Sequence, residues 1–263
     1  MKLIRSPKPW ALAALTTILG AVIALGANEI REEFHQTHPL NNQGHVELSN
    51  LNGNVRVLTW DRDEVKIDAI KRAKKQEDLD EVKIEVDAKG DRIRIKTKLP
   101  EPTTKRNKNN STGVDYTLTV PQRAHLDRIS TVNGGVELEN VSGNVEATSV
   151  NGNISATGLA GDVGLSSVNG SVKAAFARVT KAVQLKSVNG GVAIALPPEA
   201  NADVSAHTLN GGISSDFSIQ AKKRFPVGQN LDSKFGQGGP PIKLSSVNGG
   251  IRIDRAKPVA SDN

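Results

Sequence analysis

A four-residue motif, Ser-Val-Asn-Gly, recurs through the second half of this 263-residue chain and constrains its fold more than any other feature. Its Asn-Gly pair returns at steps of 18, 18, 20, 21 and 38 residues, and the last step is close to two repeats. A fixed period of about 20 residues is the sequence signature of a stacked repeat. The Asn-Gly pairs of this series are Asn133-Gly134, Asn151-Gly152, Asn169-Gly170, Asn189-Gly190, Asn210-Gly211 and Asn248-Gly249.

Two all-β architectures fit this spacing. In a β-meander or sandwich, each Asn-Gly would be a tight hairpin turn, because both residues tolerate positive φ. In a β-solenoid, each unit of 18–21 residues is one coil, and equivalent strands stack in parallel. Plainer corners at Ser142-Gly143 and Ala160-Gly161 alternate with the Asn-Gly corners, which a coil with two unlike corners explains. We therefore predict a β-solenoid over residues 131–254, with the Asn-Gly hairpin meander as the alternative.

The motif is predicted to be a structural corner of this coil. Its valine is expected to point into the core, its glycine to permit the turn, and its asparagine to stack on the asparagine of the next coil. Small residues suit the interior of a thin coil, and the interior is expected to include Ala147, Ala156, Ala174 and Ala193.

The part of the chain before the repeats is different in character. Residues 44–130 alternate as strands do, and 22 of the 34 basic residues precede Thr131, so we predict a charged antiparallel β region there. Residues 27–43 have the composition of a polar linker. They contain a His35/His38 pair, which we interpret as solvated rather than metal-binding because no third ligand is near. Residues 255–263 are predicted to be a polar tail.

The N-terminal segment, residues 1–26, is typical of a targeting sequence. Three basic residues precede an apolar run, which indicates either a cleaved signal peptide or a retained membrane anchor. Both interpretations export the body of the protein to the periplasm or cell surface. The chain has no cysteine, so disulfides and Cys-ligated metals are excluded. The net charge of +6 falls to about +3 without this segment, which does not favour a nucleic-acid partner.

One excursion, residues 214–241, breaks the repeat. It contains three of the five phenylalanines together with a basic cluster, so we predict that a ligand-binding face, if present, lies here. The alternative is that its phenylalanines cap the open end of the solenoid. The candidate ligand-binding residues are Lys222, Lys223, Arg224 and Phe225.

Several motifs together resemble a known group. The Ser-Val-Asn-Gly repeats, the segments Thr59–Val65 and Tyr116–Pro121, and the closing GGPPIKLSSVNGGIRI are similar to the bacterial putative-adhesin family of β-strand-repeat domains of unknown function. The resemblance runs from about Gly44 to Ile253. It implies an exported, solenoid-like β domain, and it brings no catalytic residues.

The hypothesis for function is a non-enzymatic, exported cell-envelope protein whose repetitive β surface serves as an adhesin or as a binding module for a polymer, a lipid surface or another envelope or host protein. A polysaccharide-active enzyme and an envelope-stress sensor or scaffold are the alternatives. Glycoside cleavage needs paired carboxylates. Glu137, Glu139 and Glu146 face Ser155, Thr157 and Gly164 in the next predicted coil, so the acids are not stacked. No catalytic residue, cofactor or metal is predicted.

Overall fold

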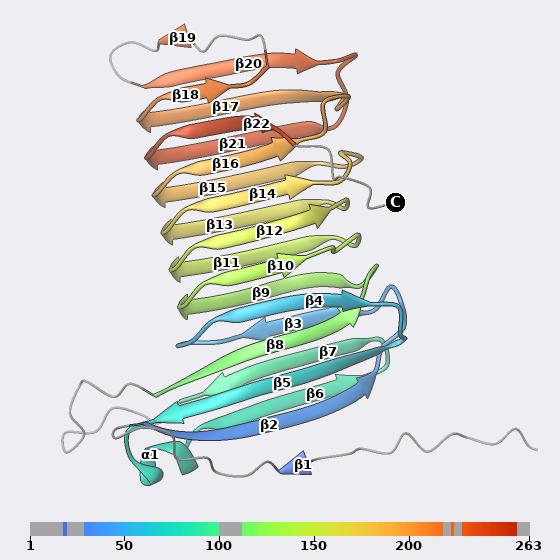
Figure 1. Cartoon of the computed structure of the whole chain (residues 1–263), viewed down its shortest axis with the longest axis vertical. Helices are drawn as coiled ribbons and strands as arrows, with labels where there is room; N and C mark the ends of the chain where they lie inside the picture. The colour runs from blue at the N-terminus through green and yellow to red at the C-terminus, as the bar shows by residue number, and fades with distance from the viewer. Residues whose placement is uncertain (1–17, 20–28, 100–111, 218–221, 224–227, 257–263) are drawn as a thin grey trace, which may run out of the picture.

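The computed structural model describes residues 29–99, 112–217 and 228–256, together with the backbone of residues 18–19 and 222–223. Two sheets of eleven strands each run along an elongated stack (Figure 1). One short helix, α1 (Gln76–Asp80), lies at the end formed by the first part of the chain. Within the described residues, no helix has the length and apolar character needed to cross a membrane.

Strand numbers follow the chain, but the strands of each sheet are given below in the order in which they pair. The first sheet, sheet A, consists of β1 (Ile18–Leu19), β2 (Ile30–Pro39), β5 (Glu64–Ala73), β8 (Gly113–Pro121), β4 (Val55–Trp60), β10 (Val136–Glu139), β12 (Ile154–Leu159), β14 (Val172–Phe176), β16 (Val192–Leu196), β22 (Ile251–Arg255) and β18 (Ile213–Ser215). The second, sheet B, consists of β19 (Lys222–Lys223), β20 (Gln229–Phe235), β17 (Ala202–Asn210), β21 (Pro241–Asn248), β15 (Val183–Asn189), β13 (Val163–Asn169), β11 (Val145–Asn151), β9 (His125–Asn133), β3 (His45–Ser49), β7 (Arg92–Lys98) and β6 (Lys83–Lys89).

Each Asn-Gly corner carries the chain from sheet B to sheet A, so the repeats form a solenoid. β11 and β12 are joined by the Asn151-Gly152 corner but lie in different sheets. β11 instead pairs in parallel with β13, with Val145 opposite Val163. The same displacement of 18 residues relates β10 to β12. The predicted solenoid is confirmed, and the hairpin alternative is wrong because the strands on either side of a corner do not pair.

The solenoid begins earlier in the chain than residue 131. β3 pairs in parallel with β9, and β4 pairs in parallel with β10, so Asn52-Gly53 forms the corner of an additional coil. At this end of the stack, antiparallel pairing joins β1, β2, β5 and β8 in sheet A, and β6 and β7 in sheet B. At the opposite end, β20 pairs antiparallel with β17 and β19. The antiparallel start is thus confirmed, but it does not include β3 and β4.

The segment predicted as a linker, residues 27–43, contains strand β2. β2 pairs antiparallel with β5 along its ten residues, and Phe34 packs against the core. His35 and His38 are three residues apart on this strand, so their side chains leave opposite faces. His35 Nδ1 lies 2.7 Å from Asp68 Oδ1, and the side chain of His38 is buried. The described residues include no group of three or more His, Cys, Asp or Glu side chains that could hold a metal.

In the repeated corner it is serine, not valine, that faces the interior. Ser149 is 2 % exposed and its hydroxyl donates to the carbonyl oxygen of Gly134, one coil below, at 2.8 Å. Val150 is 40 % exposed. The prediction that the motif valine points into the core is therefore wrong, because strand alternation from Val145 and Ala147 places Ser149 inside and Val150 outside. The exposed row contains Leu51, Val150, Val168, Val188, Val247 and Leu209.

The corner asparagines form a continuous amide ladder, as predicted. The side-chain amide of Asn151 donates to Asn133 Oδ1 at 2.8 Å, and Asn169 donates to Asn151 in the same way. Equivalent bonds run from Asn133 to Asn52, from Asn189 to Asn169, from Asn248 to Asn189 and from Asn210 to Asn248. Each amide between the two ends of the ladder therefore uses a donor and an acceptor along the stack, which fixes the register of successive coils.

The glycine of the corner is required by close packing rather than by its turn conformation. Of the corner glycines, Gly53 has a positive φ of 125°, but the six Asn-Gly glycines from Gly134 to Gly249 do not have positive φ. A Cβ at Gly152 would instead overlap the carbonyl oxygen of Gly134, and one at Gly170 would overlap that of Gly152. The expectation that glycine permits the turn is corrected: glycine permits adjacent coils to approach.

The last coils are not stacked in chain order. β21 lies between β15 and β17, and β22 lies between β16 and β18 (Figure 1). The C-terminal coil therefore sits inside the stack, below a coil that precedes it in the sequence. The final step of 38 residues therefore does not mark a skipped repeat. The coil of β21 and β22 is inserted between two coils that precede it in the sequence.

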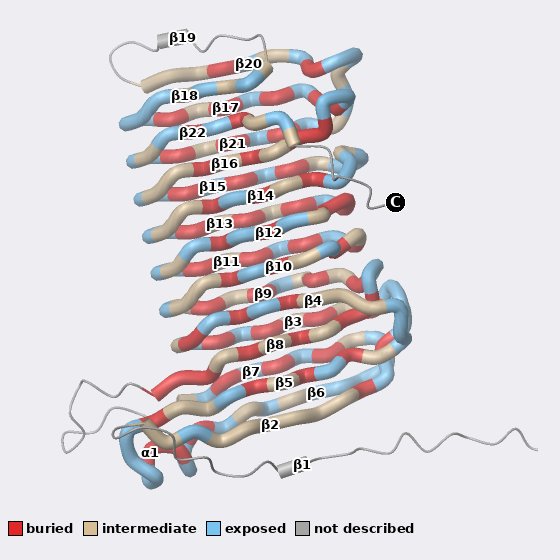
Figure 2. The backbone as a smooth tube through the Cα atoms, viewed as in Figure 1, coloured by how far each residue is buried: buried red, intermediate tan, exposed pale blue. Residues whose placement is uncertain are grey.

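The buried residues of the solenoid are mostly aliphatic, and Figure 2 shows buried segments along the whole stack. Ala147, Ala156 and Ala174 are buried, as predicted. Ala193 is not, because Val192 and Ile194 point inward on β16, so Ala193 points outward opposite Lys173.

Tyr116 provides a spectroscopic test of this core. It is the chain's only tyrosine and is 2 % exposed. Its hydroxyl oxygen lies 2.7 Å from Thr97 Oγ1. Burial raises the pKa of Tyr116 to about 12, although the bond to Thr97 acts in the opposite direction. Because the folded-state pKa exceeds the unfolded value of about 10, the folded state holds its proton more tightly, and stability falls as pH rises between these values. Absorbance at 295 nm should titrate near pH 12 in the native protein and near pH 10 in urea; a native midpoint near 10 would contradict this burial.

Candidate functional site

The predicted ligand-binding cluster lies mostly outside the described residues. The backbone of Lys222 and Lys223 forms β19, which pairs antiparallel with β20 at the end of sheet B. Arg224 and Phe225 are outside the described residues, so a binding role for this cluster stays a prediction. The other two phenylalanines of the excursion, Phe217 and Phe235, pack with ring centroids 4.5 Å apart. Their position against the core at the end of the stack agrees with the capping alternative.

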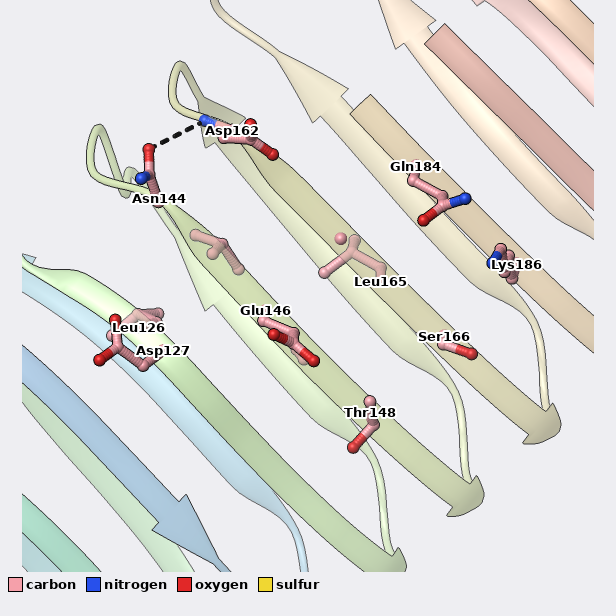
Figure 3. Close-up of a pocket in the computed structure, with 13 residues that line it drawn as sticks. Leu126, Asp127, Asn144, Glu146, Thr148, Asp162, Leu165, Ser166, Gln184 and Lys186 are labelled. Carbon is pink, nitrogen blue, oxygen red and sulfur yellow. Dashed lines mark hydrogen bonds between the residues drawn. The ribbon is translucent and has the colours of Figure 1, made fainter. Parts of the chain in front are cut away.

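A shallow trough of about 690 Å³ lies on the outer face of sheet B. Two rows of side chains cross it, one residue from each of β11, β13 and β15. Glu146, Gly164 and Gln184 form one row. Thr148, Ser166 and Lys186 form the other (Figure 3).

The trough exists because β13 contributes the smallest side chains. Gly164 and Ser166 lie between longer residues on both neighbouring strands, so the middle strand is the floor. The wall residues Glu146, Gln184 and Lys186 are exposed. A Cβ at Gly164 would have its nearest neighbour, the carbonyl oxygen of Val145, 4.0 Å away, so the space above Gly164 is open. The surface offers hydroxyl, amide, carboxylate and ammonium groups at the coil spacing of about 4.8 Å.

One end of the trough is closed by an ion-pair network. Asp127 Oδ1 lies 2.9 Å from His45 Nδ1, and Asp127 Oδ2 lies 3.0 Å from Arg92 Nη1. The parallel register of β3 and β9 places His45 opposite His125, and their rings stack at 5.1 Å. Asp127 is thus held by two partners from the first part of the chain. Its side chain therefore has a structural role in joining these strands.

The acids considered for glycoside cleavage take the positions that the sequence predicted. Glu137 pairs with Ser155, Glu139 with Thr157, and Glu146 with Gly164. Glu139 is also engaged by Arg56, at 2.6 Å. Glu137 and Glu139 share Arg56 in sheet A, whereas Glu146 lies in sheet B and does not meet them.

Most of the solenoid matches a family model. Residues 122–254 match the family model described as Toastrack DUF4097, and this is half of the chain. The chain belongs to the Toastrack DUF4097 family. The match covers β9 to β22, whereas the sequence resemblance extended back to Gly44, and the coil of β3 and β4 continues the Toastrack stack beyond the matched residues.

Solved structures similar to this Toastrack chain share little of its sequence. A putative cell adhesion protein from Clostridium sporogenes has 10% identity and a TM-score of 0.49, with 84% of this chain and 99% of that chain covered. A putative adhesin from Bacteroides fragilis has 14% identity and a TM-score of 0.42, with 85% and 97% covered. A putative lipid binding protein from Parabacteroides distasonis has 12% identity and a TM-score of 0.29, with 86% and 97% covered. Comparison with curated proteins gave no match.

Sequence reasoning missed the trough. It followed the motif and the broken repeat, and it compared outward positions of neighbouring coils only for the acidic residues. The signal was present, because the 18- and 20-residue displacements that predict Glu146 opposite Gly164 also place Gln184 beyond it.

Proposed function

We propose that this Toastrack protein is a non-enzymatic, exported module of the cell envelope that binds a hydroxyl-rich polymer along the outer face of sheet B. The observation that carries the proposal is the trough over β11, β13 and β15. It is open, crosses several coils and is lined by polar groups at a regular spacing. Small-molecule pockets are usually enclosed and apolar. A repetitive polar surface instead suits a chain-like ligand with repeated hydroxyl groups, such as a glycan.

Export is supported by the sequence of residues 1–26, in which a basic start precedes an apolar run. The absence of cysteine is compatible with an oxidising compartment, because the fold depends on strand pairing and packing alone. The partner that we propose is an envelope polymer, and the ligand lies in the periplasm or at the cell surface.

Replacing Gly164 by arginine should block this binding. The new side chain would fill the floor of the trough, and the open space above Gly164 means that the fold should tolerate it. On a glycan array, binding by the variant should fall at least about tenfold, which corresponds to about 1.4 kcal/mol. The matched control is Ser155→Arg, which adds the same charge to the exposed face of β12 in sheet A.

Two results would contradict the proposal. Equal glycan binding by the Gly164→Arg variant and the natural protein would remove the trough as the binding face. Release of shortened sugars from a bound glycan would overturn the non-enzymatic assignment and favour the polysaccharide-active alternative.

A further inference from the structure

A second depression, of about 550 Å³, lies at the plain corners of the coils rather than on the sheet face. We call it the corner pocket. Four of its lining residues are cations or can become cations: Arg123, His125, Arg178 and Lys181. None of its lining residues is aspartate or glutamate. The corner pocket therefore combines several positive groups with no built-in counter-ion.

The corner pocket is produced by the unequal lengths of two loops. Between β12 and β13 the corner is three residues long, 160–162, whereas between β14 and β15 it is six residues long, 177–182. The longer corner carries Arg178 and Lys181. It is fixed in place because Val179 packs against the core and Thr180 Oγ1 donates to the carbonyl oxygen of Ala160 at 2.9 Å.

Small residues line the middle of the pocket, where the backbones of successive corners pack closely. Gly143 and Gly161 stack there, and a Cβ on Gly161 would overlap the carbonyl oxygen of Gly143. Gly143 in turn lies against the backbone of Arg123 and Ala124. Arg123 thus lies three coil steps from Lys181, or about 14 Å at about 4.8 Å a step. Long basic side chains on the two sides can reach a group held between them.

Among the residues that the structure describes, the arginines of this pocket have no carboxylate partner, unlike several arginines elsewhere. In the first part of the chain Arg56, Arg72, Arg92 and Arg94 each lie within 4.0 Å of a carboxylate oxygen. Across the described residues, no such ion pair involves Arg123, Arg178 or Lys181. Their charges are therefore available to an external anion.

His125 supports the same electrostatic picture. Its pKa is lowered by burial first and then by the positive charge of His45; Asp127 acts in the opposite direction, and Lys181 lowers the pKa again. A bound anion would relieve this repulsion. The neighbouring side chains Gln43, Gln122, Ser142 and Asn144 add neutral hydrogen-bonding groups.

We propose that the corner pocket binds a phosphate group carried by a larger envelope molecule. Guanidinium groups form paired hydrogen bonds to phosphate oxygens, and two arginines with a lysine match a group of high negative charge. Asn144 lines both the corner pocket and the trough, so one ligand could extend across both. The inference goes beyond the proposed function and stands without it.

The test is calorimetric titration of the full-length protein at low salt with three probes. These are inorganic phosphate, a soluble poly(glycerol phosphate), and phosphatidylglycerol vesicles with phosphatidylcholine vesicles as blank. At least one phosphate-bearing probe should bind, and Arg178→Glu should weaken that binding at least about tenfold because one attractive charge becomes repulsive. Lys173→Glu is the control, since it makes the same change of charge on the exposed face of β14. Thermal unfolding of both variants should match the natural protein.

The outcomes separate the possible sources of the phosphate. Binding of the soluble polymer alone identifies a phosphate-bearing polymer, and binding of the anionic vesicles alone identifies a lipid headgroup; both support the pocket. Equal loss in Arg178→Glu and Lys173→Glu would overturn it, because net charge rather than this pocket would explain the binding. No binding of any probe would also overturn it. Binding of neutral glycans without binding of phosphate would support the proposed function and overturn the phosphate inference. Binding of phosphate without binding of glycans would support the phosphate inference and overturn the proposed function.

Discussion

Replacing Gly152 by alanine is expected to destabilise the solenoid by about 2–3 kcal/mol or more, although alanine adds a single methyl group. The methyl carbon would overlap the carbonyl oxygen of Gly134 in the coil below. This neighbour is backbone and is held by the strand pairing on both sides, so it cannot rotate away as a side chain could. The expected result is a lower urea midpoint, with hydrogen exchange accelerated most strongly in β9 and β11, because coils contact only their neighbours.

Gly164→Ala is the matched control, since Gly164 lies one coil further on, in β13. Its Cβ would have 4.0 Å of clearance, and Gly164 is not among the positive-φ glycines, so the change should remain within about 0.5 kcal/mol. If glycine were needed at the corner only for backbone freedom, Gly152→Ala would cost about 1 kcal/mol or less. Equal stability of the two variants would therefore contradict close coil contact as the reason for the regular spacing of glycine along the stack.

The coil and its register could be predicted because both follow from the spacing of the sequence repeats. The recurrence of Asn-Gly placed Asn151 on Asn169, and the same step placed Glu146 on Gly164. The direction of the motif side chains could also have been found. Val145, Ala147 and Ser149 share one parity, which fixes the serine inside and Val150 outside. Hydrophobicity alone suggested the opposite, because a buried serine is favourable only when its hydroxyl has a partner, and that partner is a carbonyl in another coil.

Features that depend on contacts between distant segments could not be predicted. β2 has a polar composition, and it becomes a strand because β5 offers it an unpaired edge. The corner pocket depends on Arg123 and Lys181, which are separated in the sequence and brought together by the stacking of corners. The order of the last coils is a further case. Coils with the same corner motif can dock on one another in more than one order, so periodicity did not determine which of the last two coils lies inside the stack.

Ending the chain at Gly239 tests that order directly and should have a larger effect than any single substitution. The missing residues include β21 and β22, whose buried Ile242, Leu244, Ile251 and Ile253 fill one layer of the core. β21 pairs with both β15 and β17, so its removal leaves two strands without their shared neighbour. Hydrogen exchange should become fast across β15 to β18 and β20, while β9 to β13 retain protection, because stability in a repeat stack is transmitted between adjacent coils.

A chain ending at Ala256 serves as the control, since it retains β22 and loses only residues that follow it. It should show the exchange pattern of the full protein. The contrary result for the shorter chain is also specific. If β17 docked directly on β15, protection would persist across both strands, and the stack would simply be one coil shorter. That outcome would show that the last two coils are interchangeable. Loss of protection would show instead that the coil of β21 and β22 is the layer on which the preceding coil depends, so that this end of the stack can form only after that coil has been made.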